Sequence, residues 1–177
     1  MKLRSLKFKS VKSTNDTALM LIKKDNIKPS IILSERQTKG RGTMGKKWIS
    51  QKGNLFLSIF FDISKKKINF KKFAILNAYL LKSILAKKFS NKIKIKWPND
   101  LLFKKKKICG ILQETVKRLN KEFLIVGIGI NLIKNPIISN YQTINLNDLV
   151  NKKISKKKIE TELKNIFEKN FKLNKSK

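Results

Sequence analysis

The sequence contains no histidine among its 177 residues and only one cysteine, Cys109. Without histidine, serine–histidine and cysteine–histidine catalysis are excluded, and so are histidine-ligated metal sites. A single cysteine cannot form an internal disulfide or a cysteine-based metal cluster. Any general base must therefore be a carboxylate, a lysine, a tyrosine or the substrate itself. Because Cys109 lies between Ile108 and Gly110 in an apolar stretch, we expect it to be a small core residue without a catalytic role.

Long apolar runs are also missing. No run approaches the roughly 18 residues that a transmembrane helix needs, so no membrane association is expected. The segment 1–12 alternates charged and apolar residues and lacks the apolar stretch of a signal peptide. The length and a hydrophobic fraction of 41% predict one domain with a buried core. We therefore expect a cytoplasmic protein.

Acidic residues are scarce, with 11 against 43 basic residues and a formal net charge of +32. Such a charge is typical of nucleic-acid-binding proteins. However, only four of the basic residues are arginines, whose planar fork matches guanine edges and phosphates. The lysines are spread along the chain beside abundant asparagine and isoleucine, so A/T-rich codon usage explains the charge equally well. A non-enzymatic nucleic-acid-binding domain remains an alternative, and no specific DNA partner is expected.

Hydrophobic patterning predicts an α+β fold. Alternating or continuous apolar runs predict strands over 3–11, 31–33, 55–63, 93–97, 101–103, 108–112 and 123–130. Helical spacing predicts a capped helix after 13–16 and further helices over 70–85 and 159–167. The four lysines at 104–107 predict a basic turn between two strands. This order indicates antiparallel hairpins and differs from a regular βαβ alternation.

The stretch 40–45 (GRGTMG) matches the dinucleotide fingerprint GxGxxG. That fingerprint requires a helix directly after the loop, whereas here Trp48 and a β-prone stretch follow, so a Rossmann site is excluded. The glycines still let the backbone approach a ligand closely, and Arg41 offers positive charge to phosphates. Taken alone, the loop is equally consistent with a basic surface loop.

Further motifs occur in a fixed order along the chain. They are STN at 13–15, QTKGRG at 37–42, GNLFLS at 53–58, KWPNDLL at 96–102, KICGIL at 107–112 and GIGINL at 127–132. This series resembles the signature of biotin–protein ligases over roughly residues 10–133. The string KWPNDL is specific, and its pairing with the glycine-rich loop is more specific still.

The resemblance implies a fold and a reaction. The fold is like that of class II aminoacyl-tRNA synthetases, with a mixed, largely antiparallel sheet flanked by helices, in one catalytic domain over 1–177. The reaction uses ATP and Mg²⁺ to activate biotin as biotinyl-5'-AMP. The biotinyl group then passes to a lysine of a biotin carboxyl carrier protein, in acetyl-CoA carboxylase or another biotin-dependent carboxylase. A lipoate- or octanoate-attaching relative is the enzyme alternative, which the KWPND string disfavours. Homodimers are common in the family, so a homodimer is an expectation.

The resemblance also implies which residues contact biotin. Thr14, Asn15 and Gln37 are expected to hydrogen-bond the ureido ring, a polar group that is costly to bury unpaired. Two catalytic residues are expected: Arg41 to hold the biotin carboxylate and the α-phosphate together, and Lys107 to stabilise developing charge. The complete expected set is Ser13, Thr14, Asn15, Gln37, Gly40, Arg41, Gly42, Thr43, Lys107, Gly110, Leu112 and Gly127.

The nucleotide side is implied in the same way. Trp48 is expected either to stack on adenine or to pack the loop once it closes. Asp100 is the candidate Mg²⁺ ligand, because a hard cation prefers oxygen. Taken alone, Lys107 is typical of a solvated turn, and only its spacing from Asp100 and Gly110 selects it. The complete expected ATP-binding set is Thr43, Met44, Lys46, Trp48, Asn99, Asp100, Lys107 and Asn131.

The sequence departs from the family pattern at several points. Thr43 and Lys46 stand where the family often has arginine. Little chain follows the helix expected over 159–167, so the small C-terminal β-barrel usual in the family is expected to be missing. The N-terminus leaves no room for a winged-helix DNA-binding domain, so no repressor function is expected.

Overall fold

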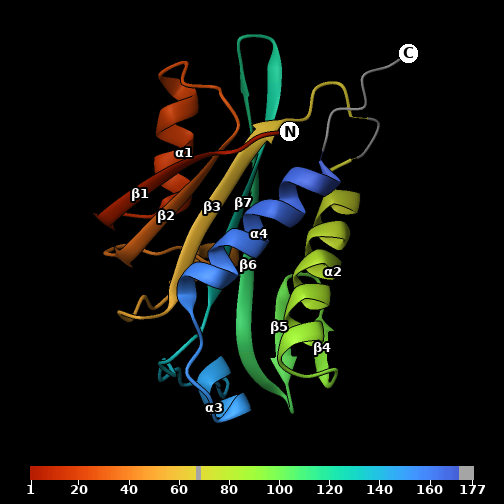
Figure 1. Cartoon of the computed structure of the whole chain (residues 1–177). Helices are drawn as coiled ribbons and strands as arrows, with labels where there is room; N and C mark the ends of the chain where they lie inside the picture. Colours follow the sequence, from red (N-terminus) through yellow and green to blue (C-terminus); the bar gives the residue numbers. More distant parts are fainter. Residues whose placement is uncertain (67–68, 172–177) are drawn as a thin grey trace.

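The computed structural model describes residues 1–66 and 69–171 (Figure 1), and the rest of the expected 1–177 domain lies outside the described residues. The strands are β1 (Arg4–Val11), β2 (Ser30–Gln37), β3 (Leu55–Asp62), β4 (Ile93–Lys96), β5 (Asp100–Phe103), β6 (Lys106–Arg118) and β7 (Lys121–Ile130). The helices are α1 (Thr14–Lys23), α2 (Phe70–Lys88), α3 (Leu146–Val150) and α4 (Lys156–Asn170), with one 3-10 turn at Thr43–Gly45.

Within the described ranges the strands form one sheet in the order β1-β2-β3-β7-β6-β5-β4. The pair β1–β2 is parallel, and the other neighbouring pairs are antiparallel. The predicted α+β class, with a mixed and largely antiparallel sheet, is therefore confirmed. The strongly twisted centre, β3, β7 and β6, runs through the middle of the molecule in Figure 1.

Helices cover both faces of the sheet. Alternate residues of β3, such as Leu57 and Phe61, pack in the larger core beneath α2 and α4, while Phe60 packs in the smaller core beneath α1. Because both faces of β3 are buried, residues 55–61 are apolar except for Ser58 and do not alternate with exposed polar residues. Figure 1 shows α2 and α4 side by side in front of the sheet and α1 at its other side.

The helix after 13–16 begins as its sequence predicts. Ser13 is the N-cap of α1, and its side-chain oxygen accepts a hydrogen bond from the backbone N–H of Asp16 at 3.4 Å. This cap satisfies one of the free N–H groups that every helix start leaves. It also fixes the residues that follow Ser13 at the sheet surface, where the functional pocket lies.

The largest difference from the sequence-based prediction concerns the basic turn. The turn is confined to Lys104 and Lys105, both with left-handed backbone, and β6 already begins at Lys106. Lys107 is therefore a strand residue, and its interpretation as part of a solvated turn is wrong. β6 also continues to Arg118, because β7 pairs with it from Cys109 to Arg118. The residues after Leu112 are mostly polar, so the apolar pattern did not predict that the strand continues.

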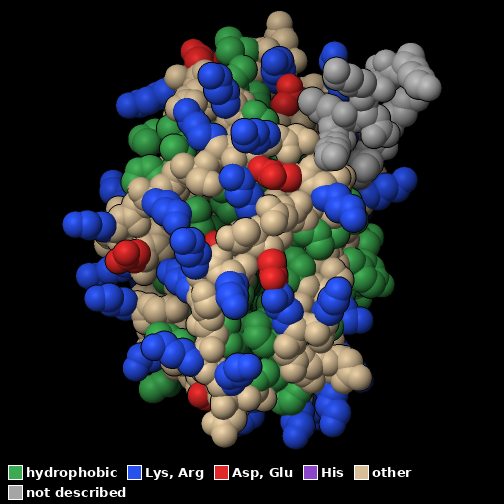
Figure 2. All heavy atoms as spheres, viewed as in Figure 1, with side chains coloured by type: hydrophobic (Ala, Val, Ile, Leu, Met, Phe, Trp, Pro, Cys, Tyr) green, Lys and Arg blue, Asp and Glu red, His purple; other side chains and the backbone are tan. Residues whose placement is uncertain are grey.

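Three smaller findings complete the description of the fold. Helix α3 was not predicted, because five residues give too short a pattern to detect. Among the described residues, no helix is long and apolar enough to cross a membrane. Figure 2 shows lysine and arginine side chains spread over the visible face rather than gathered in one patch.

Candidate active site

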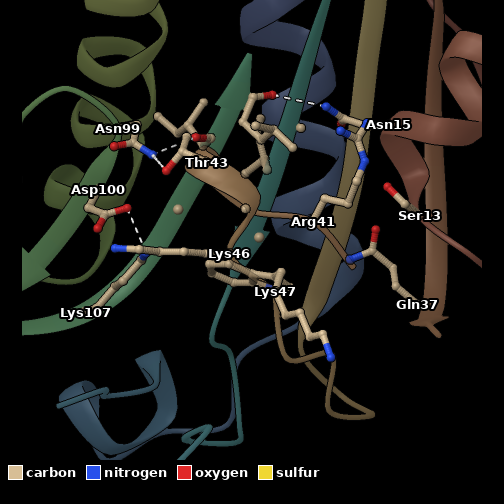
Figure 3. A pocket seen from close by; sticks show the side chains of 18 of the residues that line it. Ser13, Asn15, Gln37, Arg41, Thr43, Lys46, Lys47, Asn99, Asp100 and Lys107 are labelled. Atoms are coloured by element: carbon tan, nitrogen blue, oxygen red, sulfur yellow. Dashed lines mark hydrogen bonds and ion pairs between the residues drawn. The ribbon is translucent and has the colours of Figure 1, made fainter. Parts of the chain in front are cut away.

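A pocket opens where the start of α1, the loop after β2 and strands β5, β6 and β7 meet (Figure 3). Most of the residues expected from the sequence line it: Ser13, Thr14, Asn15, Gln37, Arg41, Gly42, Thr43, Lys46, Trp48, Asn99, Asp100, Lys107, Gly110, Leu112 and Gly127. Three expected residues do not. Gly40 packs against the backbone of Trp48, Met44 is 93% exposed, and Asn131 lines a smaller cavity beside Trp48 and Lys107.

One end of the pocket is a network of neutral polar groups. The backbone N–H and the hydroxyl of Thr14 both donate to Gln37 Oε1, at 2.8 and 3.1 Å. The amide of Gln37 donates in turn to Ser50 Oγ at 3.1 Å. Ser58 Oγ, on β3, lies 2.8 Å from the hydroxyl of Thr14. Ser58 is fully buried and does not line the pocket, but it supports Thr14 from beneath. It was not predicted from the sequence, although it belongs to the GNLFLS motif at 53–58.

Hydrogen bonds hold both polar atoms of the Asn15 side chain. Its amide donates to Leu112 O at 3.3 Å and to Glu114 Oε2 at 2.7 Å, and its Oδ1 lies 2.5 Å from Ser58 Oγ. Beneath it, a Cβ atom at Gly127 would lie 2.2 Å from Asn15 Oδ1, so that position needs glycine. Contact between Asn15 and the biotin ureido ring stays a prediction, because the ligand would have to replace one of these partners.

Arg41 reaches the same end of the pocket from the glycine-rich loop. Its Nη1 and Nη2 donate to the two carboxylate oxygens of Glu114, each at 2.8 Å, and Nη2 also lies 2.8 Å from Asp16 Oδ1. The hydrogen bonds to Glu114 are the main reason why the pKa of Arg41 is raised above its ordinary value. Sequence reasoning missed both acids. Glu114 follows Leu112 by two residues on β6, so strand alternation from Gly110 would have indicated it.

Lys107 lies across the pocket from Arg41 (Figure 3). Its Nζ is 2.8 Å from Asp100 Oδ1, and its side chain is only 14% exposed. The ammonium group also lies 5.3 Å from the Trp48 ring centre and 5.1 Å from that of Tyr141. Such contacts with aromatic faces favour a cation. Tyr141, in the segment after β7, was not predicted from the sequence.

Trp48 forms the floor between these groups. Cβ atoms at Gly110 and Gly129 would lie 2.6 and 2.4 Å from its ring, so the indole lies directly on glycine backbone of β6 and β7. Its Nε1 is buried without a hydrogen-bond partner among the described residues. Asn99 fixes the loop from the other side, because its amide donates to Ile111 O at 3.1 Å and to Thr43 Oγ1 at 3.4 Å.

The donor set for Mg²⁺ is small. Among the described residues, no cluster of three or more cysteines, aspartates or glutamates is arranged to hold a metal ion. Asp100 offers one carboxylate to the pocket, and one of its oxygens is already paired with Lys107. Mg²⁺ in nucleotide sites commonly takes one or two carboxylates together with substrate phosphates and water. The residues present fit such a site, in which the phosphates supply most of the ligands.

Comparison with known proteins identifies the family. A family model described as "Biotin/lipoate A/B protein ligase family" matches residues 7–131. The chain belongs to this family. Its sequence is 34% identical over 102 residues to the bifunctional ligase/repressor BirA of Escherichia coli, a match that covers 56% of this chain and 32% of BirA. BirA of Bacillus subtilis is 33% identical over 128 residues, which are 70% of this chain and 39% of that protein.

A solved structure agrees with these matches. Biotin protein ligase from Aquifex aeolicus, determined in complex with biotin and ATP, superposes on the present chain with a TM-score of 0.79 and is 28% identical to it in sequence. The likeness covers 94% of this chain and 69% of the Aquifex chain. The resemblance to biotin–protein ligases inferred from sequence motifs is therefore confirmed. The chain spans only 32% to 39% of the length of the two BirA proteins.

Proposed function

We propose that this chain is a biotin–protein ligase catalytic domain. It uses ATP to form biotinyl-5'-AMP and transfers the biotinyl group to a lysine of a biotin carboxyl carrier protein in the cytoplasm. The observation that supports this most directly is the arrangement of one pocket. Two cations, Arg41 and Lys107, lie on opposite sides of it, and an uncharged polar network forms one end.

The polar network suits the ureido ring of biotin. That ring has two N–H donors and one carbonyl acceptor, and each would cost free energy if it were buried without a partner. Thr14 and Gln37 line the pocket and supply hydroxyl and amide groups that both donate and accept, and Ser58 supports Thr14 from beneath. An alkyl chain such as that of octanoate would offer these groups no hydrogen bond and would shield them from water. The network therefore favours biotin over an aliphatic acid.

The two cations account for the first reaction step. A carboxylate oxygen of biotin attacks the α-phosphorus of ATP, the bond to the β-phosphate oxygen breaks, and pyrophosphate leaves. Arg41 would hold the attacking carboxylate beside the α-phosphate against their mutual repulsion, and Lys107 would stabilise the charge that gathers on the phosphate. The carboxylate is already ionised near neutral pH, since such groups have a pKa of about 4. This step therefore needs no histidine base.

The nucleotide is assigned to the other side of the pocket. Trp48 offers an indole face, and the neighbouring small cavity places Asn131 beside it, with an Oδ1 that has no partner among the described residues. Mg²⁺, when bound beside Asp100, would neutralise phosphate charge. In the second step the neutral acceptor amine attacks the activated carbonyl carbon, the bond from that carbon to the phosphate oxygen breaks, AMP leaves, and the nitrogen releases one proton to solvent.

The test is pyrophosphate exchange with ATP and Mg²⁺, run in parallel with biotin, lipoate and octanoate. We expect exchange that depends on biotin and little or none with the two other acids. Transfer is then measured with a purified biotin carboxyl carrier domain and with a variant in which its acceptor lysine is arginine. Exchange driven by lipoate or octanoate alone would contradict the proposal and assign the chain to the lipoate branch of the family.

A further inference from the structure

The guanidinium of Arg41 has two edges, and its carboxylate partners occupy them unequally. The end formed by Nη1 and Nη2 pairs with both oxygens of Glu114. Asp16 Oδ1 lies 2.8 Å from Nη2, an ion-pair contact that leaves the neighbouring Nε without a partner in the part of the chain that the structure describes. Nε is buried and has no hydrogen-bond partner among the described residues. A buried N–H without a partner is costly, so this edge is suited to an incoming acceptor.

The two acids also differ in how firmly they are held. Glu114 lies inside β6, makes two bonds to Arg41 and accepts a third from the Asn15 amide at 2.7 Å. Its side chain is 26% exposed. Asp16 lies in the first turn of α1, makes one contact with Arg41 and is 43% exposed. A single contact of an exposed acid is weak, and the released carboxylate is readily hydrated.

From this asymmetry we infer that Glu114 positions Arg41, while Asp16 is a placeholder that the substrate carboxylate replaces on the Nε–Nη2 edge. The inference rests on the proposed function, in which Arg41 binds that carboxylate. An anion on this edge makes two parallel bonds where Asp16 makes one, so the exchange favours the substrate. Glu114 keeps the guanidinium plane fixed throughout, because its own edge is not needed.

The placeholder is tested with Asp16→Asn and two ligands, biotin and its uncharged methyl ester, by isothermal titration calorimetry. Removing the competing charge should tighten biotin binding by about two- to fivefold, in line with an exposed ion pair. Methyl ester binding should stay unchanged, because an ester gains nothing from the freed edge. Asp25→Asn is the matched control. Asp25 pairs with both Nε and Nη2 of Arg118 at the other end of α1, and this variant should match the wild type.

The positioning role is tested with Glu114→Gln and Glu114→Asp. Glutamine keeps the length of the side chain but loses its charge, and aspartate keeps the charge but is one methylene too short to reach the guanidinium in the same way. Biotin binding should weaken by about tenfold or more in Glu114→Gln and by less in Glu114→Asp. Methyl ester binding should weaken less than biotin binding in both. Thermal melting checks that each variant is folded. If Glu114→Gln is unfolded, Glu114→Asp alone tests the positioning role.

Several outcomes would overturn the inference. Equal or weaker biotin binding by Asp16→Asn would exclude the placeholder, and so would an equal gain for biotin and the methyl ester. Wild-type biotin affinity in the two Glu114 variants would exclude the positioning role. Failure of the proposed function looks different, because the wild-type protein itself would then bind no biotin.

Discussion

Lys107 Nζ lies 2.8 Å from Asp100 Oδ1, and the two residues come from adjacent strands, β6 and β5. Both side chains are less than one-fifth exposed. The pair therefore holds the ammonium group in one place before any ligand arrives. Arg41 is held in a comparable way by Glu114 at the other end of the pocket. Prior fixing of cations is what makes electrostatic stabilisation effective in catalysis.

Replacing Lys107 by alanine should slow formation of biotinyl-5'-AMP by roughly a hundred- to a thousandfold, the effect of losing a group that stabilises transition-state charge. Pyrophosphate exchange measures this step. The matched control is Lys106→Ala, because Lys106 is exposed on the same strand and does not line the pocket. Equal small losses in the two variants would show that position 107 contributes only general positive charge.

Arg41→Lys should reduce exchange at least about tenfold although the charge is kept. Lysine has a single ammonium group, so it cannot pair with both oxygens of Glu114 and also present a second edge to an anion. The same substitution at Arg118, which pairs with Asp25 away from the pocket, should leave exchange unchanged. Near wild-type turnover of Arg41→Lys would remove the bridging role assigned to the guanidinium.

Alanine substitutions at two glycines should affect ATP binding and biotin binding differently. An alanine at Gly129 would press on the Trp48 ring, so Gly129→Ala should weaken ATP binding more than biotin binding. An alanine at Gly127 would press on Asn15, so Gly127→Ala should weaken biotin binding more than ATP binding. Titration calorimetry with each ligand measures both, and each variant serves as the control for the other. Parallel losses of both ligands in both variants would contradict the assignment of the two halves.

The free energy of unfolding at high pH should depend on the buried thiol of Cys109. Burial raises the pKa of its thiol well above the ordinary value, so the folded protein keeps the proton while the unfolded chain loses it. The thiol's contribution to the free energy of unfolding must then fall as pH rises above about 8.5, reaching a loss of about 2 kcal/mol near pH 10. Urea unfolding of the wild type and of Cys109→Ala at pH 7 and pH 10 isolates this term. An identical pH effect in both proteins would show that the thiol does not titrate differently on unfolding.

Binding to DNA should be weak, sensitive to salt and indifferent to sequence. The lysines are spread over the visible face, which favours phosphate contact without base recognition (Figure 2). Fluorescence anisotropy with two unrelated duplexes between 50 and 300 mM salt should give similar affinities that fall together, by about tenfold or more over this range. A footprint on one sequence at physiological salt would instead support a regulatory nucleic-acid function.

Much of the pocket was accessible from the sequence because its residues lie in short local motifs. The loop at 40–45 and the strings at 96–102 and 107–112 predicted where the chain meets its ligand. Their glycines are explained by contacts only the structure shows, such as the Trp48 ring on Gly129. Roles in ligand contact remain predictions for every expected residue, and Gly40, Met44 and Asn131 also lie outside the main pocket.

The α+β class, the absence of histidine chemistry and the family follow from composition, hydrophobic period and motif order, which are properties of the chain alone. Which charged residues pair depends instead on the folded arrangement. Arg41 and Glu114 are 73 residues apart in the sequence, and the Lys107 side chain is largely buried because β5 and the segment around Tyr141 pack on it. Pairing between distant residues depends on strand register and side-chain direction, and neither can be predicted from a short stretch of sequence.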